Sequence, residues 1–369
     1  MESSASEKYV SLQVDESRNH VYTSGSGRKT SAADMPELET GLHSPLAFPN
    51  DDYALVRLRL GFLSVIRMRL TANPSEIEEI TETRIQVTLT PSESKKLIAK
   101  AVKKLPEVQR ALAVGTILLN KSTTNAYILN ELAKEKVDVS KYASGIVTGQ
   151  GTCIADSSNS LNLHILVKGE LKEIVQPPSR RVSDVLADLL EHMGENDVFV
   201  KSANALDPWW HAAVLMAASK GSVEVTAPII RRRNVNLLVP VGLEKLIPIS
   251  VYDASREAGK LKMESSTGLP CDLVPIDGTV ITELEAVWLL TGAVAVPIAA
   301  GGVSGAEGAV TLVVKGNRHA VHSAIQVLQS VKGEKAIRVQ KQECSNCPAR
   351  KKGQLVYPRG CPGFWSSRP

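Results

Sequence analysis

A short polar turn between two apolar segments is the first place in this sequence where residue types and spacing suggest chemistry. It follows an apolar, strand-like stretch, Gly115–Asn120, and precedes a helix expected over Ala126–Ala133. The turn residues are Lys121, Ser122, Thr123, Thr124 and Asn125. A helix start has unpaired backbone N–H groups and the positive end of the helix dipole, and nearby hydroxyls add donors. The turn therefore predicts a seat for a phosphate or carboxylate, although the same residues would also serve as an ordinary helix cap.

Three further polar residues follow apolar segments downstream. Lys201 ends the strand-like Asp197–Lys201, Asp207 precedes a proline, and Lys245 lies in an apolar run after Asn236–Val241. Open α/β sheets bind ligands at the carboxyl ends of their strands, where these side chains would line a reacting centre. Each also has a purely structural interpretation. Asp207 could form an ordinary Asp-Pro turn, and Lys245, like Lys201, could be a surface lysine, with Glu244 as the counter-ion of Lys245.

A glycine-rich loop, Gly301–Gly308, contains Glu307 and follows another apolar strand. Glycines let the backbone approach a ligand closely, but the spacing does not match the dinucleotide-binding pattern, and a strand is expected to follow the loop. A desolvated glutamate can act as a nucleophile. The alternative is a tight connection with a solvated glutamate.

The C-terminal region carries a Cys-x-x-Cys pattern. The cysteines are Cys344, Cys347 and Cys361. This spacing suits tetrahedral zinc, and a proline after cysteine also occurs at iron–sulfur ligands, so zinc or an iron–sulfur cluster is the expected cofactor. A closed site needs a fourth ligand, from Cys153, from Cys271 or from a second subunit. A surface redox pair is the competing interpretation.

Alternating strand-like and helix-like segments must position these residues. The pattern predicts an α/β protein with a mainly parallel sheet and helices on both faces. We expect a low-order extension over 1–83, an α/β domain over 84–340 with a break between two lobes near 228–240, and a basic cysteine-containing tail over 341–369. Among the segments, Trp209–Ser219 is predicted as a helix, and the predicted strands include Ser222–Thr226, Pro248–Tyr252 and Lys335–Gln340.

Composition narrows the function classes. The 369 residues include 43 basic and 39 acidic side chains, and only 4% are aromatic, which disfavours nucleic acid and membrane surfaces as partners. The longest apolar run, Leu284–Ala300, is interrupted by Glu285 and Pro297 and is too short to span a bilayer. The odd cysteine count disfavours a disulfide scaffold. We expect a cytoplasmic homo-oligomer.

The polar turn resembles that of type A ribose-5-phosphate isomerases, whose superfamily includes glucosamine-6-phosphate isomerases and coenzyme A transferases. Two further segments occur in the same order and resemble isomerase segments, Ser202–Pro208 and Leu269–Pro275. The resemblance implies a phosphorylated small-molecule ligand held by residues 121–125 and an isomerase-type proton transfer. Asn204 and Ala205 stand where the isomerase has acids, however, so the fold could be inherited without the reaction.

Three functions therefore stay open. The first is binding, with or without isomerisation, of a phosphorylated metabolite. The second is acyl transfer from coenzyme A thioesters with Glu307 as the nucleophile, as in the transferases of the superfamily. The third is a non-catalytic metabolite sensor or metal-binding protein.

Overall fold

The computed structural model describes residues 12–15, 20–23, 82–156, 163–174, 180–217, 222–263, 266–345 and 347. The chain divides into two units, residues 1–51 and 52–369. In the first unit, β1 (Leu12–Asp15) and β2 (His20–Thr23) pair as an antiparallel hairpin. Everything below concerns the second unit.

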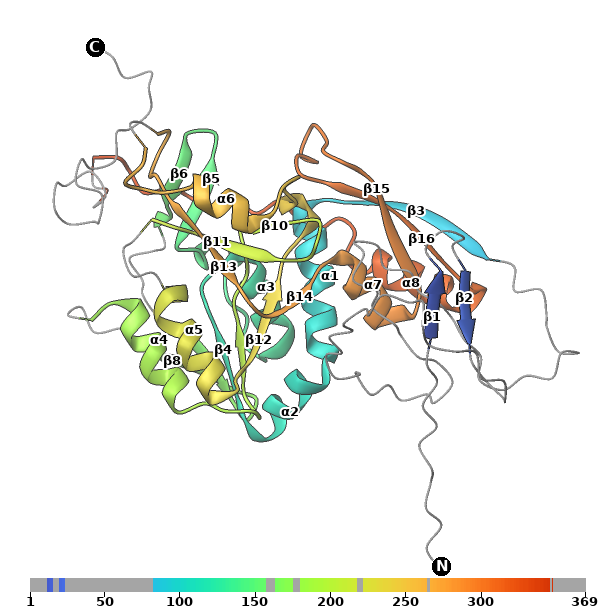
Figure 1. Ribbon diagram of the computed structural model, residues 1–369, viewed down its shortest axis with the longest axis horizontal. Coiled ribbons are helices and arrows are strands. Elements are labelled where there is room, and N and C mark those ends of the chain that lie inside the picture. The colour runs from blue at the N-terminus through green and yellow to red at the C-terminus, as the bar shows by residue number, and fades with distance from the viewer. Residues whose placement is uncertain are drawn as a thin grey trace, which may run out of the picture. The chain divides into compact units, whose positions relative to one another are not determined.

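A six-stranded sheet forms the centre of the second unit (Figure 1). Its order is β14-β12-β9-β4-β7-β8. The first four strands are parallel, and β7 and β8 are antiparallel additions at one edge. The strands are β4 (Thr116–Leu119), β7 (Leu163–Val167), β8 (Glu170–Ile174), β9 (Val198–Val200), β12 (Asn236–Pro240) and β14 (Thr279–Ile281).

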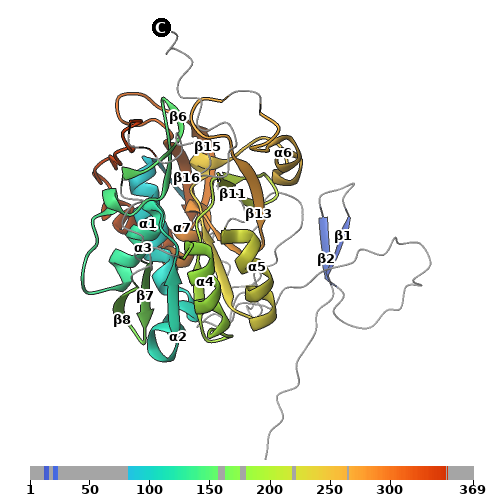
Figure 2. The ribbon, with the colours of Figure 1, turned by 90° about the vertical axis from the view of Figure 1, so that its left-hand side faces the viewer.

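Alternating side chains of the central strands pack against helices on opposite faces of this sheet. On β4, Ile117 and Leu119 join the large core, whereas Leu118 joins a second core with Phe199 of β9. Helices on the large-core face are α1 (Pro91–Lys104), α2 (Pro106–Val114), α3 (Thr123–Leu132) and α7 (Glu283–Thr291). The other face is covered by α4 (Val182–Glu191) and α5 (Ser222–Arg233), as Figure 2 shows. Strands that are covered on both faces have nearly continuous apolar sequences, which explains why these strands could be predicted from the sequence.

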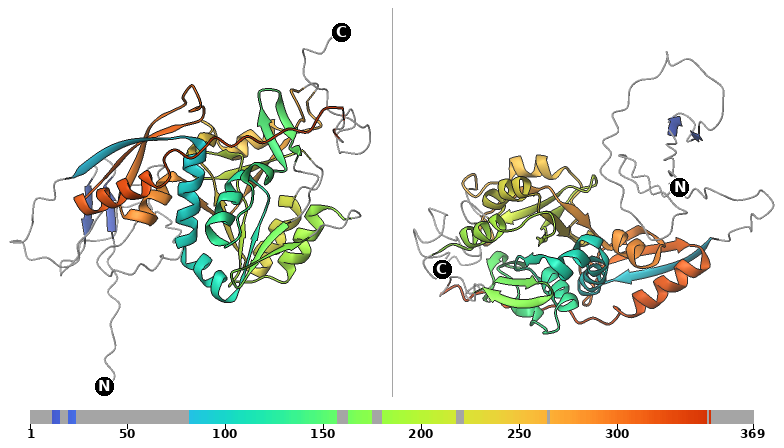
Figure 3. Two further views of the ribbon diagram at one scale, coloured as in Figure 1. Left: turned by 180° about the vertical axis from the view of Figure 1, so that it is seen from behind. Right: turned by 90° about the horizontal axis from the view of Figure 1, so that it is seen from below.

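Smaller antiparallel sheets flank the central one. Their strands are β3 (Thr83–Leu89), β15 (Val294–Ala300) and β16 (Val310–Gly316) in one sheet, β10 (Ala205–Leu206), β11 (Ala212–Met216) and β13 (Asp272–Ile276) in another, and the hairpin of β5 (Gly145–Thr148) and β6 (Gly151–Ile154). Two more helices, α6 (Val251–Glu257) and α8 (Arg318–Gln329), pack against β13 and β16 respectively (Figure 3). The expected α/β class is confirmed in this broad form, with a mixed rather than purely parallel set of sheets.

Four predicted elements are wrong. The apolar run after Trp209 forms β11, and residues 222–226 begin α5 instead of forming a strand. Pro228 inside α5 obscured the helical pattern because proline interior to a helix is normally unfavourable. Ser250 caps α6, so Pro248–Tyr252 is a helix start, and residues 335–340 form no strand.

Among the described residues, no helix has the length and apolar character needed to cross a membrane.

Candidate functional site

The carboxyl ends of β4 and β9 meet at the point where the chain changes direction across the sheet. After β4 the chain goes on to β7 and β8 on one side, and after β9 it goes on to β12 and β14 on the other. The residues that follow these parallel strands are Asn120, Lys201, Val241 and Thr282. Open α/β sheets bind ligands at such a switch point, outside the carboxyl ends of the strands.

The predicted polar turn lies at this switch point. Ser122 caps α3, and its hydroxyl accepts the Asn125 N–H at 3.0 Å. The Asn125 amide is completely buried and donates to the carbonyls of Asn120 and Val200 at 2.7 and 2.9 Å, which holds the ends of β4 and β9 together. Its Oδ1 has no hydrogen-bond partner within the described part of the chain. Thr124 is buried, and Thr123 is partly exposed.

Two lysines lie inside this edge of the sheet. Lys201 is 2% exposed, and burial lowers its pKa to about 8. Lys245, in a short 3-10 helix after β12, is partly exposed as a residue, but its ammonium is buried and donates to the Ala203 carbonyl at 2.7 Å. Burial, with a smaller contribution from the positive charge of Lys95, lowers the pKa of Lys245 to about 8 as well. An amine in this range can act as an acid or a base near neutral pH.

Three charged side chains surround Lys245. Lys95 of α1 forms an ion pair with Glu244 at 2.8 Å, and both side chains are largely buried. Glu283, the first residue of α7, is completely buried; its Oε2 accepts the Leu243 N–H at 2.9 Å. Its Oε1 has no partner among the residues described here, and burial raises its pKa, opposed in part by the hydrogen bond from Leu243. A buried carboxyl oxygen without a partner calls for an explanation, such as a ligand or a catalytic role.

A second titratable group lies on the other side of β4. His164 of β7 is paired in register with Leu119, and its ring contacts that of Tyr142 at a centroid distance of 5.3 Å. The Lys121 ammonium lies 6.0 Å from the same tyrosine ring. Burial is the main cause that lowers the pKa of both His164 and Lys121, while the charge of Glu173 opposes it. The polar turn is therefore flanked by titratable side chains on both of its sides.

Asp207 is committed to contacts with its own turn and with the start of α6. Its carboxylate is completely buried and accepts the backbone N–H groups of Trp209, His211 and Val251 and the ring of His211. These contacts occupy both of its oxygens. Sequence reasoning singled out Asp207 and passed over His211, although an Asp-Pro-x-x-His spacing in a turn was a usable signal.

The other predicted residues lie apart from this cluster. Glu307 is exposed, and its carboxylate accepts the Gly305 N–H within its own loop. Cys344 is exposed, Cys347 is partly buried, and Cys361 lies outside the described residues. In the described ranges no three His, Cys, Asp or Glu side chains are grouped closely enough to hold a metal ion.

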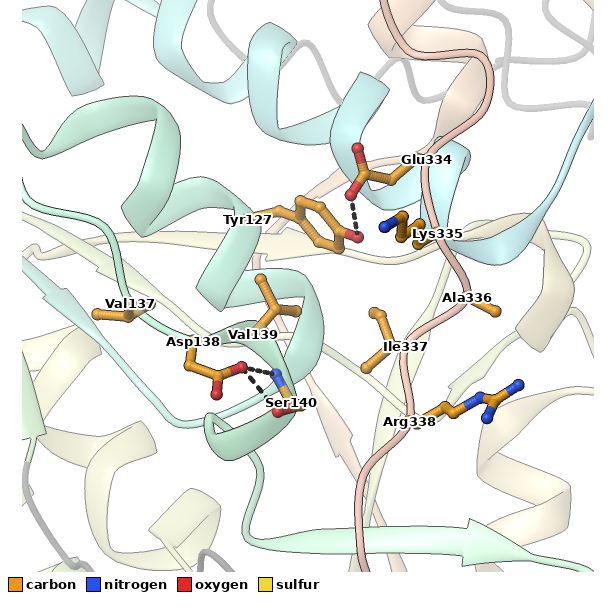
Figure 4. Close-up of a pocket in the computed structure, with 10 residues that line it drawn as sticks. All are labelled: Tyr127, Val137, Asp138, Val139, Ser140, Glu334, Lys335, Ala336, Ile337 and Arg338. Atoms are coloured by element: carbon orange, nitrogen blue, oxygen red, sulfur yellow. Dashed lines mark hydrogen bonds between the residues drawn. The ribbon is translucent and has the colours of Figure 1, made fainter.

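A groove in the described part of the second unit lies elsewhere. It measures about 800 Å³ and runs between α3 and the segment that follows α8 (Figure 4). Across it, the Tyr127 hydroxyl donates to Glu334 at 3.1 Å, and Glu334 also pairs with Lys96. None of the strand-end residues lines it. Because the polar turn, Lys201 and Lys245 all lie at the strand ends, we place the candidate site there.

Comparisons with known proteins leave the family open. No protein-family model matches the chain, and no curated protein matches its sequence significantly.

Proposed function

We propose that this protein binds a phosphorylated small metabolite at the carboxyl ends of β4, β9 and β12 and catalyses an isomerase-type proton transfer on it. The observation that carries the proposal is Lys201, a buried lysine at the switch point, one strand away from the capped start of α3. A lysine ammonium at a strand end can bind the phosphate of a ligand. The backbone N–H groups at the start of α3 favour the same anion.

The spacing of the groups suits an extended ligand. Neighbouring strands lie about 4.8 Å apart, so the polar turn after β4 and Lys245 after β12 are separated by roughly 10 Å along the sheet edge. In the proposal, residues 121–125 and Lys201 hold the phosphate, while Lys245 and Glu283 lie at the reacting end. A sugar phosphate in its open-chain form, with the phosphate and the carbonyl at opposite ends, has this layout.

The acid–base groups differ from those suggested by the sequence. Asp207 has no oxygen left to take a proton from a ligand, because its carboxylate already accepts four hydrogen bonds. Lys245, with a pKa of about 8, can change its protonation near neutral pH, and Glu283 is a completely buried carboxyl group with a raised pKa at the same end of the site. In the proposal they replace the acids absent at Asn204 and Ala205. The acyl-transferase hypothesis stays a prediction, and the exposed Glu307 does not favour it.

Calorimetric titration of the full chain with inorganic phosphate, ribose 5-phosphate, glucosamine 6-phosphate and coenzyme A tests the proposal. We expect one phosphosugar to bind, and Lys201→Met to abolish its binding. Lys104→Met, which removes an exposed lysine from the last turn of α1, is the matched control and should bind normally. Conversion of the bound phosphosugar to its keto isomer would support the reaction, and binding without turnover would reduce the proposal to a sensor. Absence of binding by every probe, or equal binding by Lys201→Met, would overturn it.

A further inference from the structure

The turn between β10 and β11 holds a histidine against a buried carboxylate. Asp207 accepts the N–H groups of Trp209 and His211 through Oδ1, both at 2.9 Å, and that of Val251 through Oδ2 at 3.2 Å. The same Oδ2 lies 3.0 Å from Nδ1 of His211. Asp207 is completely buried, whereas the His211 side chain is 47% exposed. The backbone N–H groups thus hold the carboxylate in place, and the carboxylate in turn orients the imidazole ring.

This geometry determines the tautomer of His211. A carboxylate only accepts hydrogen bonds, so Nδ1 must carry the proton and donate it to Asp207. The lone pair of the neutral ring is then on Nε2, away from the carboxylate. The hydrogen bond to Asp207 also fixes the orientation of the ring. These are the functions of the aspartate in an Asp–His pair that acts as a general base.

The backbone next to His211 is strained. Trp210 has φ = 66°, a left-handed conformation that is unfavourable for a large aromatic residue. Its indole N–H donates to Glu285 at 2.9 Å, and its backbone N–H donates to the Asp207 carbonyl at 3.0 Å, and both contacts hold the residue in place. Strain of this kind occurs preferentially at functional sites. Here it sets the position of the residue that follows, His211.

Exposed aromatic side chains lie next to the histidine. Tyr252 packs edge-on against the His211 ring at a centroid distance of 5.2 Å and is 40% exposed. Trp209, two residues before His211, is 56% exposed, and Ile249 near the start of α6 is 49% exposed. The Val251–Asp207 hydrogen bond ties the start of α6 to this turn. A planar apolar group could pack against the exposed Tyr252 ring beside His211.

We propose that Asp207 and His211 form a general-base dyad that hydrolyses small acyl compounds with a planar aromatic group. His211 Nε2 removes a proton from a water molecule as its oxygen bonds to the acyl carbon. The bond from that carbon to the aryl oxygen breaks, a carboxylic acid and an aryloxide leave, and the imidazolium returns its proton to the aryloxide or to solvent. Trp209 and Tyr252 bind the aromatic part. This site uses other residues than the anion site, so it stands whether or not phosphate binds there.

The experiment uses the full chain with p-nitrophenyl acetate as the probe and follows nitrophenolate release above the buffer rate. General-base catalysis typically contributes about 10²–10⁴-fold, so we expect His211→Gln to lower the enzymatic rate by at least about tenfold. His319→Gln, an exposed histidine on α8, is the matched control and should keep the wild-type rate. Equal rates for the wild type and His211→Gln, or an equal loss in His319→Gln, would overturn the proposal.

Two further variants separate the roles within the dyad. Trp209→Ala removes an exposed ring, so the fold should persist, and we expect KM to rise while kcat changes little. Asp207→Asn should lower kcat because the amide can hold the ring in the wrong tautomer. If Asp207→Asn fails to fold, the His211 and Trp209 variants still decide. An unchanged KM in Trp209→Ala would remove the aromatic platform from the proposal.

Discussion

Replacing Lys201 with methionine should make the protein more stable. The side chain is 2% exposed, and burial lowers its pKa from 10.5 to about 8. At about 1.36 kcal/mol per pKa unit, keeping the ammonium charged in the folded state costs roughly 3 kcal/mol at pH 7. Methionine has a similar length and carries no charge. We therefore expect Lys201→Met to raise the free energy of unfolding by up to about 3 kcal/mol at pH 7.

The sign of the pH dependence gives a second, independent readout. Between pH 8 and pH 10.5 the lysine is protonated in the unfolded chain and neutral in the folded one, so the stability of the wild type rises with pH across this window. The advantage of Lys201→Met should therefore shrink as pH increases toward 10.5. Urea denaturation at pH 7 and pH 10 measures both effects, with Lys104→Met as the control. A Lys201→Met protein less stable than wild type at pH 7 would refute the reasoning, because it would show that the contacts of the ammonium inside the fold outweigh the cost of burying it.

Two further substitutions test how the site is held together. Asn125→Ala removes the side-chain amide that donates to the carbonyls of Asn120 and Val200. We expect this change to lower the free energy of unfolding by about 2–3 kcal/mol at an unchanged urea m-value. Glu93 has a lowered pKa because hydrogen bonds from Lys332 and two backbone N–H groups outweigh its burial. Its stabilisation is present above pH 4.5 and is lost as pH falls through the lowered pKa. Acid denaturation of Glu93→Gln should therefore show a weaker pH dependence than that of wild type, and an identical curve would contradict this assignment.

Local signals in the sequence predicted the part of the site that is local in structure. Thr90 and Glu93, whose spacing is that of a capping box, form one at the start of α1, and Ser122 caps α3 where the polar turn predicted it. These contacts join residues three apart, and side-chain types alone specify them. The apolar strands β4 and β9 were equally clear because both of their faces are buried.

The rest of the site depends on contacts between distant residues. In the sequence, Glu283 looks like the first acidic residue of an ordinary helix. The pairing of β12 with β14 brings its Oε2 within 2.9 Å of the backbone nitrogen of Leu243, which is 40 residues away in the sequence. The burial of Lys201 and Lys245 likewise follows from the packing of several elements, since neither lysine differs locally from a surface lysine. The contact between His211 and Asp207 is likewise set by the fold of the turn between β10 and β11.

If the buried lysines hold a phosphate, binding must change their protonation. A bound dianion stabilises the charged form of Lys201 and raises its pKa above the value of about 8 that burial gives it. At pH 8.5 the free protein carries this lysine largely neutral, so binding should take up protons from the buffer. Titrations with the same phosphosugar in two buffers of different ionisation enthalpy measure this uptake directly. We expect up to about one proton per site from Lys201 at pH 8.5, with much less at pH 6.5, where the lysine is already charged. Binding with equal heats in both buffers at pH 8.5 would mean that the anion does not contact the buried lysines, and it would locate the phosphate at the helix start alone.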